Sequence, residues 1–216
     1  MSIEERGQND NLALQRERGI DANKSLVNEI VEAISSKWEV PAESPKQPVI
    51  LLMGGFQGSG KTSVIDALSS KMPLIAISSD EIRHNLFQKI PFSAVFVHTV
   101  NAARNHLIDK ALETRQHVAV DLFCTPIRLE LFRSFAKDTS YNILTVYLEA
   151  SRDTLIKRME RPAQAGKYKG TLEELQADFD AYGELGLNIY DAVFNSEQQS
   201  PEEISEALLQ MVKDLQ

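Results

Sequence analysis

The chain carries the apolar run Val49-Ile50-Leu51-Leu52-Met53 and, one residue later, the stretch Gly55-Phe56-Gln57-Gly58-Ser59-Gly60-Lys61-Thr62. The apolar run predicts a strand that is buried on both faces. Glycines let the loop after this strand take positive φ, which brings backbone N–H groups close to an anion. The loop opens a helix, expected from residue 61 to about residue 70, whose first amides and dipole favour negative charge at the same point.

This stretch matches the phosphate-binding pattern G-x-x-x-x-G-K-[ST], with the strand before it and the helix after it that the pattern requires. In such loops the lysine, here Lys61, reaches the β- and γ-phosphates, and the hydroxyl of Thr62 ligates Mg²⁺. A glycine-rich turn that carries a lysine by chance is the alternative, which the flanking strand and helix disfavour. We expect a nucleoside triphosphate to be bound by Gly55, Phe56, Gln57, Gly58, Ser59, Gly60, Lys61, Thr62 and Ser63.

Length and composition fit one α/β domain with an extension. The chain has 216 residues, of which 43% are hydrophobic and 25% charged, as is usual for a globular protein. Its net charge of -8 argues against sequence-independent coating of nucleic acid. The single cysteine, Cys124, excludes an internal disulfide and favours a reducing compartment. Neither a signal peptide nor a membrane span is predicted, so we expect a cytoplasmic protein.

Strands and helices are predicted to alternate along the chain, with turn residues between them. Strands are expected at residues 49–53, 74–77, 117–121, 143–148 and 192–194. Helices are expected at residues 23–38, 61–70, 78–88, 93–114, 125–136, 151–160, 171–185 and 200–215. This alternation predicts an α/β fold: a mostly parallel sheet of about five strands, with helices on both faces and ligands at the carboxyl ends of the strands.

Three prolines, Pro41, Pro45 and Pro48, separate the first helix from the rest of the chain. We therefore divide the chain into an N-terminal helical extension with its linker, residues 1–46, and a second domain, residues 47–216. Apolar residues recur in the first helix at helical spacing, so this helix packs either on the domain's own side or on a partner. Partner binding or self-association through this helix stays open.

Asp80 and Arg83 follow the second predicted strand, at the edge of the sheet where the triphosphate is expected. A carboxylate there orients an acceptor hydroxyl and takes its proton. Arg83, three residues on and on the same helical face, is placed to hold an anionic substrate. The alternative is structural: Asp80 complements the helix dipole and Arg83 is a solvated charge. Ser78 and Glu81 have the spacing of a capping box for this helix.

The residues at the end of the third strand favour phosphoryl transfer over hydrolysis or a conformational switch. Asp121 is followed by Leu122 rather than by the glutamate with which motor-type ATPases activate water. No Asn-Lys-x-Asp motif, with which GTPases recognise guanine, lies downstream. We expect Asp121 to support Mg²⁺ through water, together with Thr62.

A basic segment follows the fourth strand. Arg158 and Arg161 precede a glycine-containing loop with Lys167 and Lys169, and we expect a lid near residues 158–170. Cations on such a lid neutralise the charge of the transferring phosphoryl group and exclude water. The alternative is a basic helix C-terminus that complements the dipole.

The chain resembles the small P-loop kinase group, which includes polynucleotide 5′-hydroxyl kinases, zeta-toxin-like kinases and AAA-domain-type ATP-binding kinases. The resemblance lies in the phosphate-binding loop, Ser79-Asp80-x-x-Arg83, Val120-Asp121, an Arg128-bearing helix and Leu155-x-x-Arg158-x-x-Arg161. It covers the chain from about residue 49 onward and implies a P-loop NTPase fold. In the polynucleotide kinase branch the matching Asp is the base and the nearby Arg positions the substrate, which implies these roles for Asp80 and Arg83. A lid Arg faces the phosphates, a role that falls on Arg158 or Arg161.

The sequence departs from the polynucleotide kinase branch after the third strand. That branch has an Asp-x-Thr-Asn stretch, which Asp121-Leu122-Phe123-Cys124 replaces here, so polar acceptor contacts are missing. The helix at residues 93–114 offers His98, Asn101 and Arg104 as substitutes. For this helix, however, we expect a solvated polar face beside an apolar stripe. No histidine has metal-ligand spacing, so no zinc site is predicted.

We therefore predict an ATP- and Mg²⁺-dependent kinase that transfers the γ-phosphoryl group to a hydroxyl of a small-molecule or nucleotide-like acceptor. Its expected catalytic residues are Lys61, Asp80, Arg83, Arg158 and Arg161. The alternative is a nucleotide-binding regulator or partner-binding protein, including a toxin-like one, in which Asp80 only caps a helix and the N-terminal helix docks the partner. The acceptor, the preference for ATP or GTP and the oligomeric state do not follow from the sequence.

Overall fold

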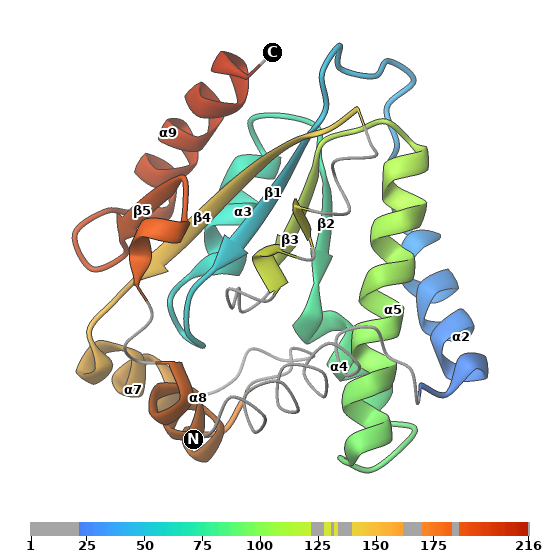
Figure 1. Cartoon of the computed structure of the whole chain (residues 1–216), viewed down its shortest axis with the longest axis vertical. Coiled ribbons are helices and arrows are strands. Elements are labelled where there is room, and N and C mark those ends of the chain that lie inside the picture. The colour runs from blue at the N-terminus through green and yellow to red at the C-terminus, as the bar shows by residue number, and fades with distance from the viewer. Residues whose placement is uncertain are drawn as a thin grey trace, which may run out of the picture.

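The computed structural model contains a five-stranded sheet in which all neighbouring strands pair in parallel (Figure 1). The structure describes residues 22–121, 128–130, 132–133, 140–161, 170–182 and 186–215. The strands are β1 (Val49–Gly54), β2 (Ile75–Ser78), β3 (Val118–Asp121), β4 (Asn142–Glu149) and β5 (Ala192–Asn195). They lie in the order β2-β3-β1-β4-β5, which confirms the predicted parallel α/β sheet.

Helices connect the strands and cover the sheet. They are α2 (Lys24–Ser35), α3 (Lys61–Ser69), α4 (Ser79–Phe87), α5 (Ala94–Glu113), α7 (Arg152–Glu160), α8 (Leu172–Tyr182) and α9 (Pro201–Asp214), with a 3-10 turn at Leu187–Ile189. Of the helix predicted at residues 125–136, the described residues 128–130 and 132–133 are helical. No helix in the described ranges is long and apolar enough to cross a membrane.

Side-chain caps set the starts of several helices. Thr171 and Glu174 form both halves of a capping box before α8, since each accepts a hydrogen bond from the other's backbone N–H. Before α4 only one half of the predicted box is formed. The Ser78 hydroxyl accepts from the Glu81 amide, while the Glu81 carboxylate accepts from Lys37 instead. The helix starts where expected because one half of the box already satisfies an N–H of its first turn.

The central strand β1 sends alternate side chains into two cores. Ile50 and Leu52 lie in the core that α2 and α5 cover, while Leu51 and Met53 lie in the core formed with α3 and α9. All six residues of β1 are buried, which confirms the strand buried on both faces that its apolar run predicted. Figure 1 shows α2 beside α5 and α3 beside α9.

The N-terminal helix α2 belongs to the first of these cores. Val27, Ile30 and Ile34 are buried in it together with side chains of α5. At the start of the helix, the Asn23 N–H donates to Thr99 Oγ1 of α5 at 3.0 Å. The sequence left open whether this helix packs on the domain or on a partner, and the structure shows it packed on the domain. The division of the chain at residue 46 stays a prediction.

Ile30→Ala is expected to lower the free energy of unfolding by about 2–5 kcal/mol, because it leaves a cavity in a close-packed core. Ile30 is 1% exposed. Urea unfolding followed by circular dichroism measures the effect. Val40→Ala, at a linker position that is 47% exposed, is the control. An unchanged free energy of unfolding for Ile30→Ala would show that α2 contributes little to the folded domain.

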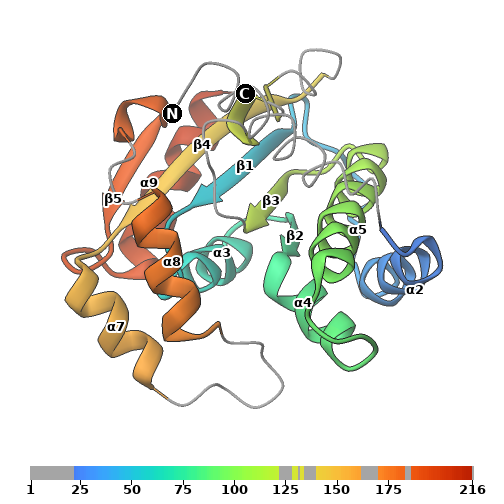
Figure 2. The same cartoon turned by 60° about the horizontal axis from the view of Figure 1, so that its bottom comes forward.

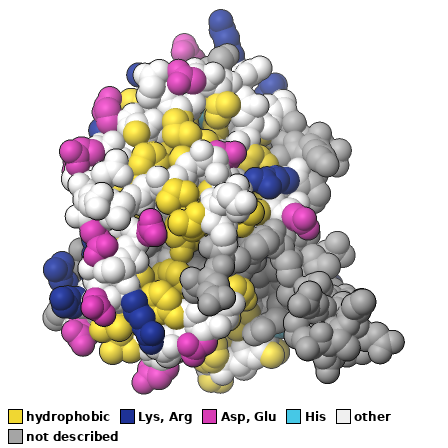
Figure 3. Space-filling model, turned by 60° about the vertical axis from the view of Figure 1, so that its left-hand side comes forward, with side chains coloured by type: hydrophobic (Ala, Val, Ile, Leu, Met, Phe, Trp, Pro, Cys, Tyr) yellow, Lys and Arg dark blue, Asp and Glu magenta, His cyan; other side chains and the backbone are white. Residues whose placement is uncertain are grey.

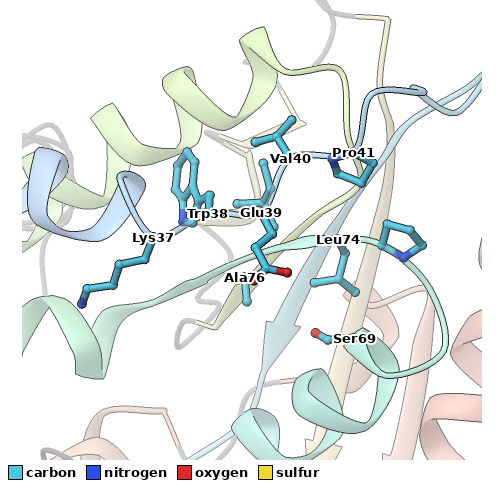
Figure 4. A pocket seen from close by; sticks show the side chains of 10 residues that line it. Lys37, Trp38, Glu39, Val40, Pro41, Ser69, Leu74 and Ala76 are labelled. Carbon is cyan, nitrogen blue, oxygen red and sulfur yellow. The ribbon is translucent and has the colours of Figure 1, made fainter.

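The two edges of the sheet are covered differently. Beside β5 and α9, Figure 3 shows a band of hydrophobic side chains between charged ones, and Val193 of β5 is 40% exposed. Beside β2 lies a pocket of about 610 Å³, with Trp38 and Val40 of the linker on one side and Leu74 and Ala76 on the other (Figure 4). This pocket adjoins the beginning of β2, whereas ligands of such sheets bind at the carboxyl ends of the strands.

Candidate active site

The loop between β1 and α3 has the backbone of a phosphate cradle. Gly55, Gly58 and Gly60 have positive φ values of 133°, 79° and 100°. At Gly55 a Cβ would lie 2.6 Å from Ser59 Oγ and 2.7 Å from the Leu148 carbonyl oxygen, so no larger residue fits. Gly60 is the N-cap of α3 in a left-handed conformation that other residues rarely adopt. The loop therefore delivers the N-terminus of α3 to the carboxyl end of β1, where an anion would meet its N–H groups.

Lys61 and Thr62, at the start of α3, both contact Asp121 at the end of β3. Lys61 Nζ donates to the carbonyl oxygens of Gly55 (2.9 Å) and Phe56 (3.1 Å) and lies 3.9 Å from Asp121 Oδ1. Thr62 Oγ1 donates to Asp121 Oδ2 at 2.9 Å. Burial raises the pKa of Asp121, while the nearby charge of Lys61 opposes this rise. The structure thus brings together the lysine and both predicted metal-binding residues.

The oxygen atoms of Thr62 and Asp121 fit Mg²⁺, which prefers hydroxyl, carboxylate, phosphate and water oxygens. The parallel register places Asp121 beside Met53, directly before the phosphate-binding loop. A Mg²⁺ ion here would complete its shell with phosphate and water oxygens. Within the described residues, no group of three or more His, Cys, Asp or Glu side chains is arranged to hold a metal.

Asp80 and Arg83 form an ion pair on one face of α4. Arg83 Nη1 donates to Asp80 Oδ1 at 2.8 Å, and the two side chains are 36% and 48% exposed, respectively. The pair lies next to the end of β3, because Ser79 Oγ donates to the Asp121 carbonyl oxygen at 3.0 Å. The charge of Asp80 raises the pKa of Asp121, and that of Arg83 lowers it, both less strongly than burial raises it. The predicted acceptor residues therefore adjoin the predicted phosphate site.

Arg158 of α7 joins the phosphate-binding loop to the turn after β5. Its Nη1 donates to the carbonyl oxygen of Gly58 (3.1 Å) and to Ser196 Oγ (3.0 Å), and its Nη2 donates to the Ser196 carbonyl oxygen (2.8 Å). These contacts support the loop's backbone, a role that the Arg-x-x-Arg spacing did not suggest. Arg161 ends α7 with an exposed side chain. The other lid cations, Lys167 and Lys169, lie outside the described residues.

Two serines of the predicted nucleotide-binding set, and Cys124, remain to be placed. Ser59 is fully buried in the loop, and Ser63 is exposed in the first turn of α3. Cys124 lies outside the described residues.

Helix α8 packs against the phosphate-binding loop. Phe179 stacks on Phe56, with ring centroids 4.3 Å apart. Gly170, shortly before the helix, lies so close to Gln57 that a Cβ would fall 1.7 Å from Gln57 Oε1. Figure 2 shows α3, α4, α7 and α8 around the carboxyl ends of the strands. Phe56, expected only as a loop residue, therefore also packs against α8, and Gln57 lies against the segment before it.

Asp178 of α8 is a candidate site residue that the sequence patterns did not reveal. Burial raises its pKa, whereas the nearby cations Arg128 and Arg83 lower it. The charges of Arg128 and Arg83 thus act on this carboxylate. The sequence did contain a hint of this residue. Leu175 and Phe179 are apolar and four residues apart, which marks the packed face of α8, and Asp178 lies beside them.

The polar line of α5 is buried, and the expectation of a solvated face was wrong. His98, Asn101 and Arg104 are 7%, 4% and 3% exposed, and Arg104 Nη1 donates to Asn101 Oδ1 at 3.1 Å. Helical spacing shows which residues share a face but does not show what covers that face. Whether these residues contact an acceptor stays a prediction.

The fold and the site together define a P-loop protein with a phosphate cradle at the carboxyl end of β1. The family model of the AAA domain matches residues 50–182, which is more than half of the chain. The chain belongs to this AAA domain family. A comparison with curated protein sequences found no match.

Several solved structures with a similar fold are described as kinases. An APS kinase from Mycobacterium tuberculosis, in complex with AMPPNP and APS, is 17% identical with a TM-score of 0.57, covering 78% of this chain and 99% of that chain. A shikimate kinase from Acinetobacter baumannii is 17% identical with a TM-score of 0.51, covering 79% and 96%. A sugar kinase from Janibacter sp. is 14% identical with a TM-score of 0.53, covering 77% and 95%. At these identities the similarity shows the fold of small P-loop kinases, as the motifs implied.

Arg158→Ala is expected to weaken Mg-ATP binding about tenfold. Hydrogen bonds to charged groups contribute about 1.5–3 kcal/mol, and partial exposure places these at the lower end. The reason is that Arg158 holds the backbone at Gly58, inside the phosphate cradle. Calorimetric titration measures the affinity, with Lys157→Ala, the exposed neighbour on α7, as the matched control. If both variants bind like the wild type, Arg158 does not shape the loop.

Proposed function

We propose that this protein is an ATP- and Mg²⁺-dependent kinase that phosphorylates a hydroxyl of a small-molecule or nucleotide-like acceptor. One observation carries the proposal: Lys61, Thr62 and Asp121 meet at the phosphate-binding loop, and the Asp80–Arg83 pair adjoins them. Membership of the AAA domain family and the P-loop kinase fold support nucleotide binding. The cytoplasm as its location stays a prediction from the sequence.

In this proposal each residue has one task. Lys61 leaves the loop carbonyls to bind the β- and γ-phosphates, and Thr62 with Asp121 would hold Mg²⁺, which would neutralise phosphate charge. Asp80 orients the acceptor hydroxyl and takes its proton as the new O–P bond forms and the bond to the β-phosphate oxygen breaks, releasing ADP. Arg83 positions the acceptor.

Arg158 of α7 and Arg161, which follows it, have different roles in this proposal. Arg161 neutralises charge on the transferred group from the end of α7. Arg158 keeps the loop in shape through its contacts with Gly58 and Ser196. Positioning and charge neutralisation supply most of the catalysis, because the transition state of phosphoryl transfer is loose.

A nucleotide-binding regulator is the second proposal, and one observation favours it. Asp80 lies in the first turn of α4, where a carboxylate stabilises the helix whether or not it has a catalytic task. In that proposal the N-terminal helix docks a partner. The apolar side of α2 is already buried against α5, so a partner or a second copy would have to bind its exposed side.

A transfer screen separates the two proposals. γ-Labelled ATP is incubated with the protein and a panel of hydroxyl-bearing metabolites and oligonucleotides, with Asp80→Ala as the control. A kinase labels at least one acceptor, and the variant does not. A protein that binds Mg-ATP but labels nothing in the panel supports the regulator.

A further inference from the structure

The far end of α4 and the turn into α5 carry three exposed apolar side chains, which we call the apolar tip. Phe87, Phe92 and Val95 are 61%, 64% and 43% exposed and lie within nine residues of one another in the sequence. The ring of Phe92 lies 5.4 Å from that of Phe96, which is buried at the start of α5. Single exposed apolar residues are ordinary, but a group of them marks a binding surface.

Phe87 shares a face of α4 with Asp80 and Arg83. Residues three, four and seven apart lie on the same side of a helix, and the spacing places Phe87 between the other two when viewed along the axis. The adjoining side of α4 carries Ile82 and Leu86, which are fully buried. One face of the helix thus presents a carboxylate, a cation and an aromatic ring in succession.

Along α4, Asp80, Arg83 and Phe87 lie progressively further from the phosphate site. The start of α4 adjoins β3, since Ser78 is in register with Asp121 and Ser79 bonds to it. A helix rises about 1.5 Å per residue, so Phe87 lies roughly 10 Å further along the axis than Asp80. Figure 2 shows α4 beginning near the end of β3 and running outward to the turn into α5. Phe87 of the apolar tip therefore lies on the helix face that leads from the candidate active site.

We propose that the apolar tip is a subsite for an aromatic ring of the acceptor. The inference rests on the proposed kinase function and deepens it. The acceptor's hydroxyl lies at Asp80, its anionic group lies at Arg83, and its ring packs on Phe87, whose backbone position is roughly 10 Å from that of Asp80 along the helix axis. Such a ring occurs in a nucleoside monophosphate and in an aryl glycoside phosphate. A small polyol has no group that reaches Phe87.

The ring's contribution is measured with two matched pairs of probes by calorimetry on the full chain. The first pair is uridine 3′-monophosphate and ribose 3-phosphate, and the second is phenyl and methyl β-D-glucoside 6-phosphate. Within each pair the hydroxyl and phosphate groups are kept and only the ring is lost. Each probe is titrated with and without saturating Mg²⁺ and AMPPNP. We expect at least one aromatic probe to bind about tenfold more tightly than its partner, because aromatic packing contributes on that order.

Variants assign this difference to the apolar tip. Phe87→Ala should remove the difference, and Phe87→Tyr, which keeps a ring, should retain it. Val193→Ala, at an exposed apolar position on β5, is the matched control and should leave it unchanged. The proposal is overturned if the two members of each pair bind equally, if neither aromatic probe binds, or if the difference survives Phe87→Ala. An apolar tip that serves a protein partner instead would give one of these results. Failure of the kinase function appears separately, as AMPPNP binding that is absent or insensitive to Lys61→Ala.

Discussion

Lys61→Ala is expected to remove the calorimetric heat of Mg-ATP binding and to reduce phosphoryl transfer at least about a hundredfold. The ammonium group is 3.9 Å from Asp121 and is held by two loop carbonyls, so it lies where the outer phosphates would enter the cradle. Its loss removes a positive charge from a largely buried site, where the interaction with phosphate is strong. It also leaves Asp121 without the nearby cation that opposes the rise of its pKa, so the carboxylate becomes a poorer Mg²⁺ ligand.

The control for this experiment is Lys71→Ala, which removes a surface cation paired with Glu206 and should bind Mg-ATP like the wild type. Circular dichroism establishes that both variants are folded. Titrations with Mg-ATP and Mg-GTP also show which purine is preferred. Heat of the same size from wild type and Lys61→Ala would mean that the loop does not grip the triphosphate, and the kinase proposal would then fail.

Local features of the fold were predictable because they depend on neighbouring residues. The unbroken apolar run at residues 49–53 requires two covered faces, and the structure provides a core on each. Caps such as Thr171 with Glu174 satisfy N–H groups within one turn, so their effect does not depend on the rest of the chain. The phosphate-binding loop needs its glycines for backbone conformations that few other residues adopt, as Gly60 shows.

Features that depend on contacts distant in the sequence were not predictable. Arg158 bonds to the loop carbonyl of Gly58, one hundred residues earlier, a partner that no spacing within α7 indicates. The charge of Arg83 acts on Asp178 of α8, a helix whose Phe179 stacks on Phe56 of the phosphate-binding loop. His98 is polar but buried, since helical spacing cannot show what covers a face.

Asp80→Asn is expected to retain Mg-ATP affinity within about twofold and to lower transfer to the acceptor found by the screen by about 10² to 10⁴-fold. The amide keeps the shape of the side chain and an oxygen for Arg83, but it no longer accepts the proton of the attacking hydroxyl. We expect ATP binding to be spared, because the charge of Asp80 raises the pKa of Asp121 and so disfavours its ionised form in the wild type. Its removal therefore favours the ionised carboxylate that Mg²⁺ needs.

Calorimetry and single-turnover transfer, measured on the same protein, give the two quantities separately. Glu81→Gln is the matched control, because this neighbouring carboxylate pairs with Lys37. Transfer by Asp80→Asn at the wild-type rate would exclude Asp80 as the base. Asp178→Asn, measured in parallel, then decides between the remaining possibilities. Loss of transfer in that variant moves the base to α8, where the charge of Arg83 also acts on Asp178. Unchanged transfer in both variants means that neither carboxylate takes the proton, and the acceptor hydroxyl then loses it to the phosphoryl group or to water.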